Sequence, residues 1–468
     1  MQRLVLDPLT RIEKGGGETV NTQKWDTLII GSGLAGLSCG LELAERGQRV
    51  HILEAAPYPG GRTSNWSDTG MEVESGFHKY IGFYQALPDL LRRAGIKLNT
   101  MLTWEKTFEI RLPDGETTGE YGIAPLKSPI KTVSGAFGNS DILSAVDKAS
   151  LMPFVAEGLR LLAEDPMELD TYSVAEFARK HGVKEGALDN ILTPLTSGVL
   201  FLPPDRYSAL VFFGLFAPGL PRFYKLQLGA FNGGMTDVMI APIVAKLESL
   251  GSRVSLNSPV SALSVKEGRV TGVSLADGST LDADHVVLAT EVSAAKHLLQ
   301  PAFDGEQWLR PLQALPTMPD VTIQLELSEP LLPQDRATFG PGTCIGSFSE
   351  QSRTTFRGVP GRVSMILTPP EEFIEMPDEL IFERVCEDAD KLGLGLRAAA
   401  TDYRVIRRPD HFYAVQPGSE RLRPEQRTPV PGLSLAGDYT RQPMYATMEG
   451  AVLSGRKAAE AVLGRELD

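Results

Sequence analysis

The stretch from residue 26 to residue 54 reads DTLIIGSGLAGLSCGLELAERGQRVHILE. Its first five residues form a short apolar run of the kind found in buried strands. The run GSGLAG at 31–36 follows at once, and apolar residues at helical spacing predict a helix that continues to Gly47. Residues 48–53 are predicted to form a second strand, which ends at Glu54. Strand, glycine-rich turn, helix and strand in this order predict the βαβ unit of a doubly wound α/β fold.

Each glycine of this turn has a role in binding a dinucleotide. Gly31 permits the tight turn, Gly33 lets the backbone approach a pyrophosphate, and Gly36 allows close packing of the helix on the strand. The helix N-terminus adds unpaired N–H groups and a partial positive charge. A carboxylate at Glu54 can accept a hydrogen bond from a ribose hydroxyl, and it disfavours the extra phosphate of NADP. The predicted nucleotide contacts here are Gly31, Ser32, Gly33, Leu34, Ala35, Gly36 and Glu54.

The composition is that of an ordinary globular enzyme. The chain has 468 residues, which favours two domains, and 42% of them are hydrophobic while 22% are charged. A net charge of −13 argues against a nucleic-acid partner, because phosphate binding needs clustered Lys and Arg. The three cysteines are widely spaced, so we expect neither a disulfide framework nor a metal site, and we expect a reducing compartment.

No segment of the chain reads as a membrane span or a secretory signal. Runs of 18 or more apolar residues are missing from the sequence, and residues 1–24 lack the apolar core of a signal peptide. We therefore expect a flexible tail at 1–24 and a cytoplasmic protein that can sit on the inner face of a membrane.

A second motif follows Glu54. Residues 54–62 read EAAPYPGGR, which is an acid, an alanine, four further residues and GGR. This pattern resembles the second signature of the flavin amine oxidase and carotenoid desaturase superfamily. The resemblance implies FAD as cofactor, with Arg62 near its phosphate and ribityl region and with Ala55 and Gly61 beside it. Taken alone, the glycines would be an ordinary turn and Arg62 a surface charge.

Two distant segments resemble the remaining parts of the same cofactor site. Residues 252–260 (SRVSLNSPV) have strand character, and in flavoproteins of this class the residue that matches Val260 binds adenine through its backbone. Residues 433–438 (LSLAGD) predict a strand that ends at Gly437 and Asp438, and a helix is predicted over 445–463. The resemblance implies that Asp438 binds the ribityl chain and that N–H groups near Met448 stabilise the reduced flavin. Asp438 could instead cap a helix.

Beyond these motifs, most of the chain from residue 26 onward resembles the plant and cyanobacterial phytoene and zeta-carotene desaturases. The similar stretches include ESGFH at 74–78, IGFY at 81–84 and LAGDYTRQPMYATMEGAVLSG at 435–455. Two positions depart from the related families. Plant phytoene desaturases carry an arginine where this chain has Val238, which puts phytoene itself in doubt as substrate. Amine oxidases carry an aromatic residue where this chain has Thr447, which counts against amine oxidation.

The resemblance implies hydride transfer from a C–H group of a hydrophobic substrate to flavin N5, with loss of a proton and formation of a C=C bond. A quinone, or failing that oxygen, would then accept the electrons. His78 and Tyr80 are candidate substrate contacts, although a structural role is favoured for His78, and no residue is assigned as catalytic. The uncharged stretch at 207–221 is a candidate for peripheral membrane contact or a buried helix of the substrate domain.

The expected architecture is a Rossmann-like FAD domain of the glutathione-reductase type, interleaved with an α+β substrate domain. The FAD domain is expected to comprise 25–105, 226–300 and 425–468, and the substrate domain 106–225 and 301–424. An isoprenoid desaturase is the leading functional interpretation. A flavin oxidase of amines, porphyrinogens or triterpenoids is the first alternative, and a flavin-free prenyl-binding escort protein the second. The two flavin-dependent interpretations require that the stretches near residues 31, 62 and 438 meet in space around one flavin nucleotide.

Overall fold

The computed structural model describes residues 24–123 and 138–467. The tail predicted at 1–24 lies outside these residues apart from Lys24. The predicted βαβ unit is present as β1 (Trp25–Ile30), α1 (Leu34–Ala44) and β2 (Val50–Leu53), and the α/β fold class is confirmed. β1 and β2 pair in parallel, and every residue of α1 is buried. A helix that is apolar on nearly all sides requires neighbours on all sides, which the rest of the chain supplies.

The first sheet is assembled from three distant parts of the sequence. Its parallel strands lie in the order β10, β2, β1, β13 and β19, and β12 and β11 continue antiparallel from the first half of β13. The added strands are β10 (Arg253–Ser255), β11 (Val260–Lys266), β12 (Arg269–Leu275), β13 (Thr280–Leu288) and β19 (Leu433–Leu435). The strands of one sheet thus come from three separate stretches of chain, while the expected domain limits stay a prediction.

One strand prediction needs correction. Residues 252–260 do not form a single strand, because β10 ends at Ser255 and β11 begins only at Val260. Asn257 between them has a φ of +50°, a left-handed conformation that an extended strand does not allow. The predicted helix at 445–463 begins three residues late, at Met448, since Tyr445 also has a positive φ.

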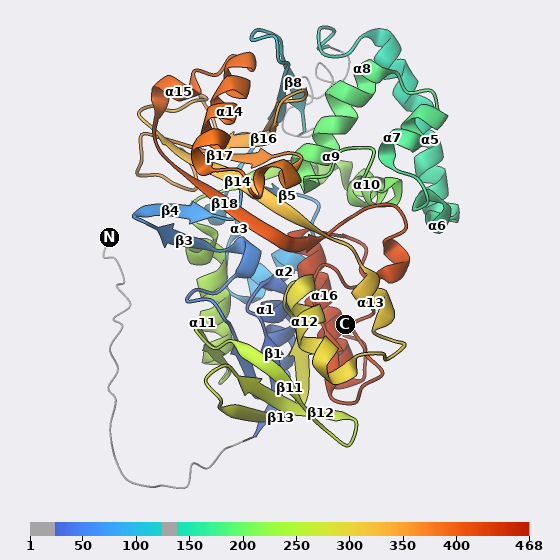
Figure 1. The fold of residues 1–468 in the computed structure, drawn as a ribbon, viewed down its shortest axis with the longest axis vertical. Helices are drawn as coiled ribbons and strands as arrows, with labels where there is room; N and C mark the ends of the chain where they lie inside the picture. Colours follow the sequence, from blue (N-terminus) through green and yellow to red (C-terminus); the bar gives the residue numbers. More distant parts are fainter. Residues whose placement is uncertain (1–23, 124–137, 468) are drawn as a thin grey trace.

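Helices cover one face of this sheet. α16 (Met448–Leu463) lies beside α1, and α11 (Ala241–Ser249) packs against the same helix; these elements form the lower part of the molecule in Figure 1. Gly455 makes the close approach of α16 to α1 possible, because a Cβ there would lie 2.2 Å from the carbonyl oxygen of Ala35. Ser38 Oγ also donates a hydrogen bond to the carbonyl of Val452, 2.9 Å away.

The substitution Gly455→Ala is expected to destabilise the protein by about 1–3 kcal/mol, because the added methyl forces α16 away from α1. Urea unfolding would measure the loss. Gly358→Ala is the matched control, since a Cβ at Gly358 meets no atom within 4 Å. Equal unfolding midpoints for the two variants would contradict this close packing of α16 on α1.

The second sheet lies above the first in Figure 1 and has the order β18, β14, β17, β16, β15, β7 and β8. All its pairs are antiparallel except β15 with β7. Its strands are β7 (Thr107–Arg111), β8 (Thr118–Gly122), β14 (Thr317–Leu327), β15 (Thr338–Phe339), β16 (Ile345–Glu350), β17 (Gly361–Leu367) and β18 (Ala400–Tyr413). Helices α5 (Ala145–Glu164), α6 (Pro166–Leu169), α7 (Val174–Lys180), α8 (Glu185–Ala187), α9 (Thr193–Leu200) and α10 (Ala209–Phe216) lie beside it.

The described residues contain further strands, helices and turns. The strands among them are β3 (Asn65–Asp68), β4 (Met71–Glu74), β5 (Tyr80–Ile81), β6 (Leu102–Trp104) and β9 (Leu228–Phe231). The α-helices are α2 (Ala86–Arg93), α3 (Leu98–Met101), α12 (Val292–Phe303), α13 (Arg310–Ala314), α14 (Asp378–Lys391) and α15 (Leu396–Ala399). The 3-10 and π turns are η1 (Gly61–Thr63), η2 (Leu188–Leu192), η3 (Ala217–Lys225), η4 (Thr236–Ile240), η5 (Pro370–Phe373) and η6 (Glu420–Leu422).

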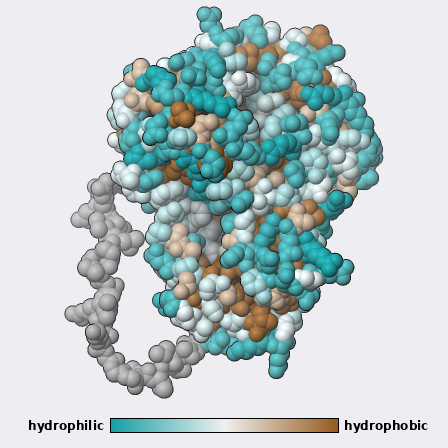
Figure 2. Space-filling view, in the orientation of Figure 1, coloured by the Kyte–Doolittle hydropathy of each residue, from teal (hydrophilic) through white to brown (hydrophobic). Residues whose placement is uncertain are grey.

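The uncharged stretch at 207–221 divides into a buried and an exposed part. Residues 209–215 of α10 are all buried, which matches the interpretation as a core helix. Phe216 and Leu220, which follow, are 37% and 55% exposed. On the face shown in Figure 2, hydrophobic residues form separate patches among hydrophilic ones. Among the described residues, the helices are either too short or too polar to cross a lipid bilayer.

Candidate active site

The glycine-rich turn leaves an open space above Gly33. A Cβ at Gly31 would lie 2.6 Å from the carbonyl oxygen of Ala289, and one at Gly36 would lie 2.1 Å from the oxygen of Gly31, so both positions require glycine for packing. A Cβ at Gly33, by contrast, meets no atom within 4 Å. Gly33 precedes the N-terminus of α1, and this open space is where the predicted pyrophosphate would contact backbone N–H groups.

The second motif lies directly against this turn. Gly33 and Gly60 form a parallel bridge, and a Cβ at Gly61 would lie 3.4 Å from Gly33 Cα. Gly61 has a φ of +57°, which lets the chain turn sharply into η1 and present Arg62. The GGR motif therefore shapes one side of the space above Gly33.

Glu54 ties the turn to the second strand. Its Oε2 accepts hydrogen bonds from the backbone N and the Oγ of Ser32, at 2.9 and 2.7 Å, and its Oε1 accepts one from the N of Ala56 at 2.9 Å. A carboxylate offers roughly four lone-pair positions, so one remains for a ribose hydroxyl. The backbone N of Ser258 donates to the carbonyl of Glu54, which brings the start of β11 at Val260 to this end of the turn.

Arg62 and Asp438 form a two-pronged ion pair across 376 residues of sequence. Arg62 Nη1 lies 2.9 Å from Asp438 Oδ2 and Nη2 lies 2.5 Å from Oδ1. The Asp438 side chain is 5% exposed and that of Arg62 is 23% exposed. Burial alone would lower the pKa of Arg62, but Asp438 raises it above its ordinary value. The stretches near residues 31, 62 and 438 therefore do meet in space.

The loop after β19 holds Asp438 against α16. Ser454 Oγ accepts a hydrogen bond from the N of Gly437 at 2.7 Å. The alternative that Asp438 caps α16 is wrong, because Thr447 is the cap and its Oγ1 accepts from the N of Gly450 at 3.0 Å. Met448 is the first residue of the helix, and its contact with the flavin stays a prediction.

The two candidate substrate residues differ in their surroundings. The Nδ1 of His78 lies 2.8 Å from the carbonyl oxygen of Gly76. Burial lowers the pKa of His78 to about 4, and the charges of Arg62 and Arg408 lower it as well, so the His78 ring is neutral. Tyr80 is 1% exposed and packs edge-on against Tyr84 and Trp104 in the hydrophobic core. Both assignments as substrate contacts stay predictions.

Residues that the sequence motifs did not indicate surround Arg62 from the second sheet. Phe412 lies under the guanidinium, 4.6 Å from Arg62 Cζ to the ring centre. Asp320 Oδ1, Arg408 Nη1 and His411 Nε2 are buried atoms without a hydrogen-bond partner in the described part of the chain. Burial raises the pKa of Asp320 to about 6, against the opposing charges of Arg408 and Arg62. Unsatisfied buried atoms are rare in folded proteins, and a bound polar cofactor would supply their partners.

The buried His411 side chain makes the stability of the protein depend on pH. Burial, with the charges of Arg62 and Arg408, lowers the pKa of His411 to about 2, while an unfolded histidine titrates near pH 6.5. The unfolded chain therefore takes up a proton below about pH 6.5 that the folded chain does not. Because this proton stabilises the unfolded state alone, the free energy of unfolding decreases as the pH falls below about 6.5.

We expect the free energy of unfolding of the wild type to decrease relative to that of His411→Gln by roughly 1 kcal/mol per pH unit between about pH 6.5 and 5. Above about pH 7 the difference is expected to be constant. Urea unfolding at a series of pH values would measure it, and other titrating groups cancel in the difference. Parallel stability curves down to pH 5 would contradict the neutral state of His411.

These residues fit a flavin nucleotide in three respects. The glycine turn offers an open space at a helix N-terminus, Arg408 adds a positive charge beside the Arg62–Asp438 pair, and several buried polar atoms have no hydrogen-bond partner among the described residues.

The sequence of the chain is similar to those of two carotenoid desaturases. The chain is 28% identical to the 15-cis-phytoene desaturase of Synechococcus elongatus in an alignment 464 positions long, which covers 94% of this chain and 96% of the relative. It is 29% identical to the zeta-carotene desaturase of Synechocystis in an alignment 487 positions long, which covers 94% of this chain and 97% of the relative.

A solved structure shares the fold. The structure of an oxidoreductase from Methanosarcina mazei superposes with a TM-score of 0.72 at 20% identity, and 94% of this chain and all of that chain are covered. The model of the flavin containing amine oxidoreductase family matches residues 34–463, nearly the whole described chain. The predicted resemblance to the flavin amine oxidase and carotenoid desaturase superfamily is confirmed, and the interpretation as a flavin-free escort protein loses its support. The protein is a flavin-dependent oxidoreductase, and its chain belongs to the family of flavin containing amine oxidoreductases.

Proposed function

We propose that this oxidoreductase binds FAD and desaturates a carotenoid or another isoprenoid. The observation that carries the proposal is the apolar wall that begins at the predicted cofactor site. Phe412 lies under Arg62, and its ring centre is 5.7 Å from that of Phe201. Phe201 and its neighbours Leu200 and Leu202 are all buried in the same hydrophobic cluster. An apolar wall next to a flavin suits a long hydrocarbon chain, and the relatives from Synechococcus and Synechocystis are both carotenoid desaturases.

FAD is proposed over a mononucleotide flavin because the site extends in two directions from the glycine turn. Arg62 and Asp438 lie on one side, where the ribityl chain is expected. Glu54 and the start of β11 at Val260 lie on the other side, where ribose and adenine are expected.

Bound flavin would accept a hydride from a substrate C–H group, while the neighbouring carbon loses a proton and a C=C bond forms. The protein positions the substrate and excludes water from the wall around Phe412. A quinone or oxygen is proposed as the acceptor that returns the flavin to its oxidised state. His78 and Tyr80 stay the candidates for contact with substrate, and His78 would meet a hydrocarbon as a neutral ring.

A peripheral membrane contact is proposed for the end of the uncharged stretch. Phe216, Leu220 and Tyr224 are 37%, 55% and 53% exposed, and Arg222 and Lys225 lie among them. Exposed apolar side chains next to cations suit an interface with lipid headgroups. Such a contact would give a water-insoluble isoprenoid a route from the membrane.

The visible spectrum of the purified protein tests the cofactor, and mass spectrometry of the released chromophore distinguishes FAD from other flavins. Anaerobic incubation with phytoene, zeta-carotene and squalene-type lipids then tests the reaction, since an oxidisable substrate bleaches the flavin. Bleaching by at least one of these isoprenoids supports the proposal. Bleaching by an amine such as putrescine, with no response to any isoprenoid, would overturn it.

A further inference from the structure

Asp320 is a buried carboxylate on β14, an interior strand of the second sheet. It is 1% exposed, and within residues 24–123 and 138–467 its Oδ1 has no hydrogen-bond partner. A carboxylate buried in this way destabilises a fold, and an apolar residue of similar size would fill the position without that penalty. A destabilising side chain kept at a buried position indicates a function for that side chain.

The neighbours of Asp320 along β14 show which way its side chain points. Side chains alternate between the two faces of a strand, so Asp320 shares a face with Met318 and Thr322. Thr322 Oγ1 donates a hydrogen bond to the carbonyl of Ser75 at 3.2 Å, and Ser75 Oγ donates one to the carbonyl of Arg62 at 2.6 Å. The face that carries Asp320 is therefore the one that covers the segment of Arg62.

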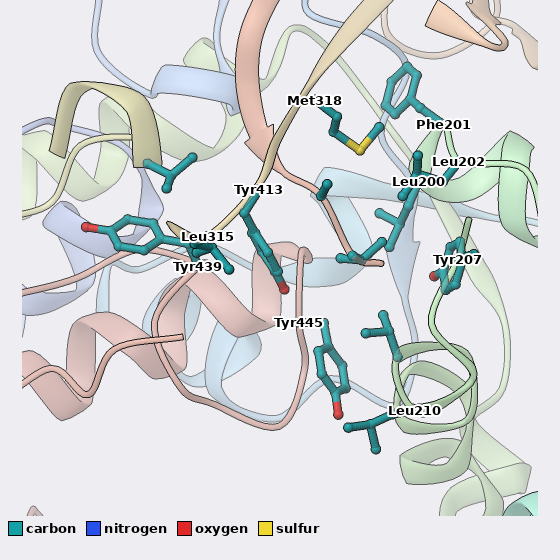
Figure 3. Packing of buried hydrophobic residues seen from close by; sticks show 14 of the residues in the cluster. Leu200, Phe201, Leu202, Tyr207, Leu210, Leu315, Met318, Tyr413, Tyr439 and Tyr445 are labelled. Carbon is teal, nitrogen blue, oxygen red and sulfur yellow. The ribbon is translucent and has the colours of Figure 1, made fainter. Parts of the chain in front are cut away.

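Asp320 also adjoins the apolar wall. Met318, two residues earlier, pairs with Phe412 of β18, whose ring lies under the Arg62 guanidinium. In Figure 3 the side chain of Met318 is directed toward Phe201, and both belong to one hydrophobic cluster. Residues two apart on a strand are separated by roughly 7 Å along it. A hydrocarbon chain that lies along Met318 and Phe412 would therefore come within reach of the Asp320 carboxylate.

The pairing of β14 with β18 is irregular at this point. Between the pairs Met318–Phe412 and Asp320–Arg408, β14 has one residue and β18 has three. Such a bulge bends the strand and redirects its side chains, and bulges are common beside active sites. The Arg408 guanidinium lies over the ring of Trp66, 5.6 Å from its centre, and its Nη1 lacks a hydrogen-bond partner in the described chain. Arg408 thus brings positive charge close to Asp320 and leaves Oδ1 free to accept a proton.

The surrounding charges keep Asp320 ionised at neutral pH. Burial raises the pKa of Asp320 to about 6, and the charges of Arg408 and Arg62 oppose this rise. The other titratable groups that interact with these two arginines are Tyr58, His78, Glu291, His411 and Asp438. Both histidines are neutral, because burial and the two arginines lower their pKa values. A carboxylate whose pKa lies just below neutral pH can accept a proton and release it again.

We propose that Asp320 is a catalytic residue, the base that accepts the proton released from the substrate as the C=C bond forms. This inference rests on the proposed isoprenoid desaturation and assigns its proton acceptor. One substrate carbon loses a hydride, with both electrons of its C–H bond, to the flavin. The electron pair of the C–H bond on the neighbouring carbon becomes the second bond of C=C, and its hydrogen passes as a proton to Asp320 Oδ1. The resulting carboxylic acid gives this proton to water before the next turnover.

The carboxylate has a second effect on the same step. Loss of the hydride leaves positive charge on the substrate carbon, and a negative charge fixed nearby in an apolar site stabilises it. Asp320 therefore lowers the barrier for hydride loss as well as for proton loss.

Asp320→Asn tests the proposal, because the amide keeps the shape of the side chain but does not take up the proton. Flavin bleaching is followed in a single turnover without oxygen, with whichever of phytoene, zeta-carotene and squalene bleaches the wild type. The rate constant at saturating substrate is expected to fall about a hundredfold or more, while the half-saturating concentration changes less than about threefold. The wild-type rate is expected to increase as the pH rises through about 6, whereas the rate of the variant stays independent of pH.

The flavin-free protein allows a check on Asp320 that needs no turnover. An unfolded aspartate titrates near pH 3.9, so between about pH 4 and 6 the folded chain alone holds this proton. The stability of the wild type relative to Asp320→Asn is therefore expected to decrease as the pH rises from about 4 to about 6, and then to stay constant. Urea unfolding at a series of pH values measures the difference. A decrease that continues to pH 8 or beyond would mean a neutral Asp320 at pH 7 and would overturn the proposal.

Asp388→Asn is the matched control for replacing a buried aspartate. Asp388 is 7% exposed, but it lies on α14, and its Oδ2 accepts a hydrogen bond from the N of Cys344 at 2.6 Å. This variant is expected to lose stability and to keep the wild-type rate of bleaching. Equal losses of rate in the two variants would assign the effect to disturbed packing and overturn the proposal.

The cofactor and a polar group of the substrate are the other candidate partners of Asp320 Oδ1. Asp320→Asn protein that carries less flavin than the wild type would assign the oxygen to cofactor binding. A raised half-saturating concentration with the full wild-type rate would assign it to substrate binding, and either result overturns the proposal. Failure of the proposed function looks different, because none of the three lipids would then bleach the flavin of the wild type.

Discussion

Gly33→Ala is expected to yield a folded protein that has lost its flavin. The space that the new methyl group would fill is free of protein atoms within 4 Å, and Gly33 has a φ of −67°, which alanine adopts easily. We therefore expect the free energy of unfolding of the flavin-free protein to stay within about 1 kcal/mol of the wild type. The methyl would stand where the pyrophosphate must approach the backbone, so the affinity for FAD is expected to fall at least about a hundredfold, or about 2.7 kcal/mol.

The ratio of flavin to protein absorbance, followed by titration of the flavin-free protein with FAD, measures this loss. Gly36→Ala is the comparison, because its methyl would collide with the oxygen of Gly31 at 2.1 Å. That variant is expected to lose stability as well as flavin. A Gly33→Ala protein that retains its full flavin content would mean that the nucleotide does not bind over this turn.

Asp438→Ala is expected to destabilise the protein more than Gly455→Ala or Gly33→Ala does. It leaves the Arg62 guanidinium without its partner at a site where the aspartate is 5% exposed, and breaking such a pair costs about 3–5 kcal/mol. Flavin binding is expected to be lost at the same time, since the carboxylate is the proposed contact of the ribityl chain. Urea unfolding and the visible spectrum measure the two effects separately.

A double-mutant cycle with Arg62→Ala shows whether the pair acts as a unit. The double variant is expected to lose less stability than the two single variants added together, because neither charge is then left unpaired. Glu425→Ala breaks the exposed Arg441–Glu425 pair and is the control, with an expected cost below about 1 kcal/mol. Additive effects of Arg62→Ala and Asp438→Ala would contradict the coupling seen in the structure.

The sequence predicted those parts of the fold that depend on local signals. The βαβ unit was found because its strand, glycine turn and helix follow one another without interruption. The helix was expected to run to Gly47 and ends at Ala44, since helix ends depend on packing against neighbours that a local pattern does not reveal. The strand at 252–260 was wrong because Asn257 adopts a left-handed turn, and asparagine favours this conformation more than most residues, so the sequence held a signal that the prediction did not use.

The candidate site was predictable where it consists of motifs and unpredictable where it depends on sheet register. Arg62 and Asp438 were both expected at the cofactor, and the ion pair between them joins the two motifs. Asp320 and Arg408 were not expected, because they meet only through the pairing of β14 with β18. Which residue of a long strand faces the cofactor depends on that register, and a shift of one position would turn the opposite face inward.

The place of β19 in the first sheet has a consequence for synthesis of the protein. One edge of β13 is completed only by residues 433–435, and α1, which also packs against α11, meets α16 only once residues 448–463 have left the ribosome. More than four hundred residues are therefore synthesised while β13 has an open edge and α1 has an apolar surface that α16 does not yet cover. Both features favour aggregation. We expect the nascent chain to depend on chaperones until its last turn of helix emerges, and a fusion that delays the C-terminus to lower the yield of folded enzyme.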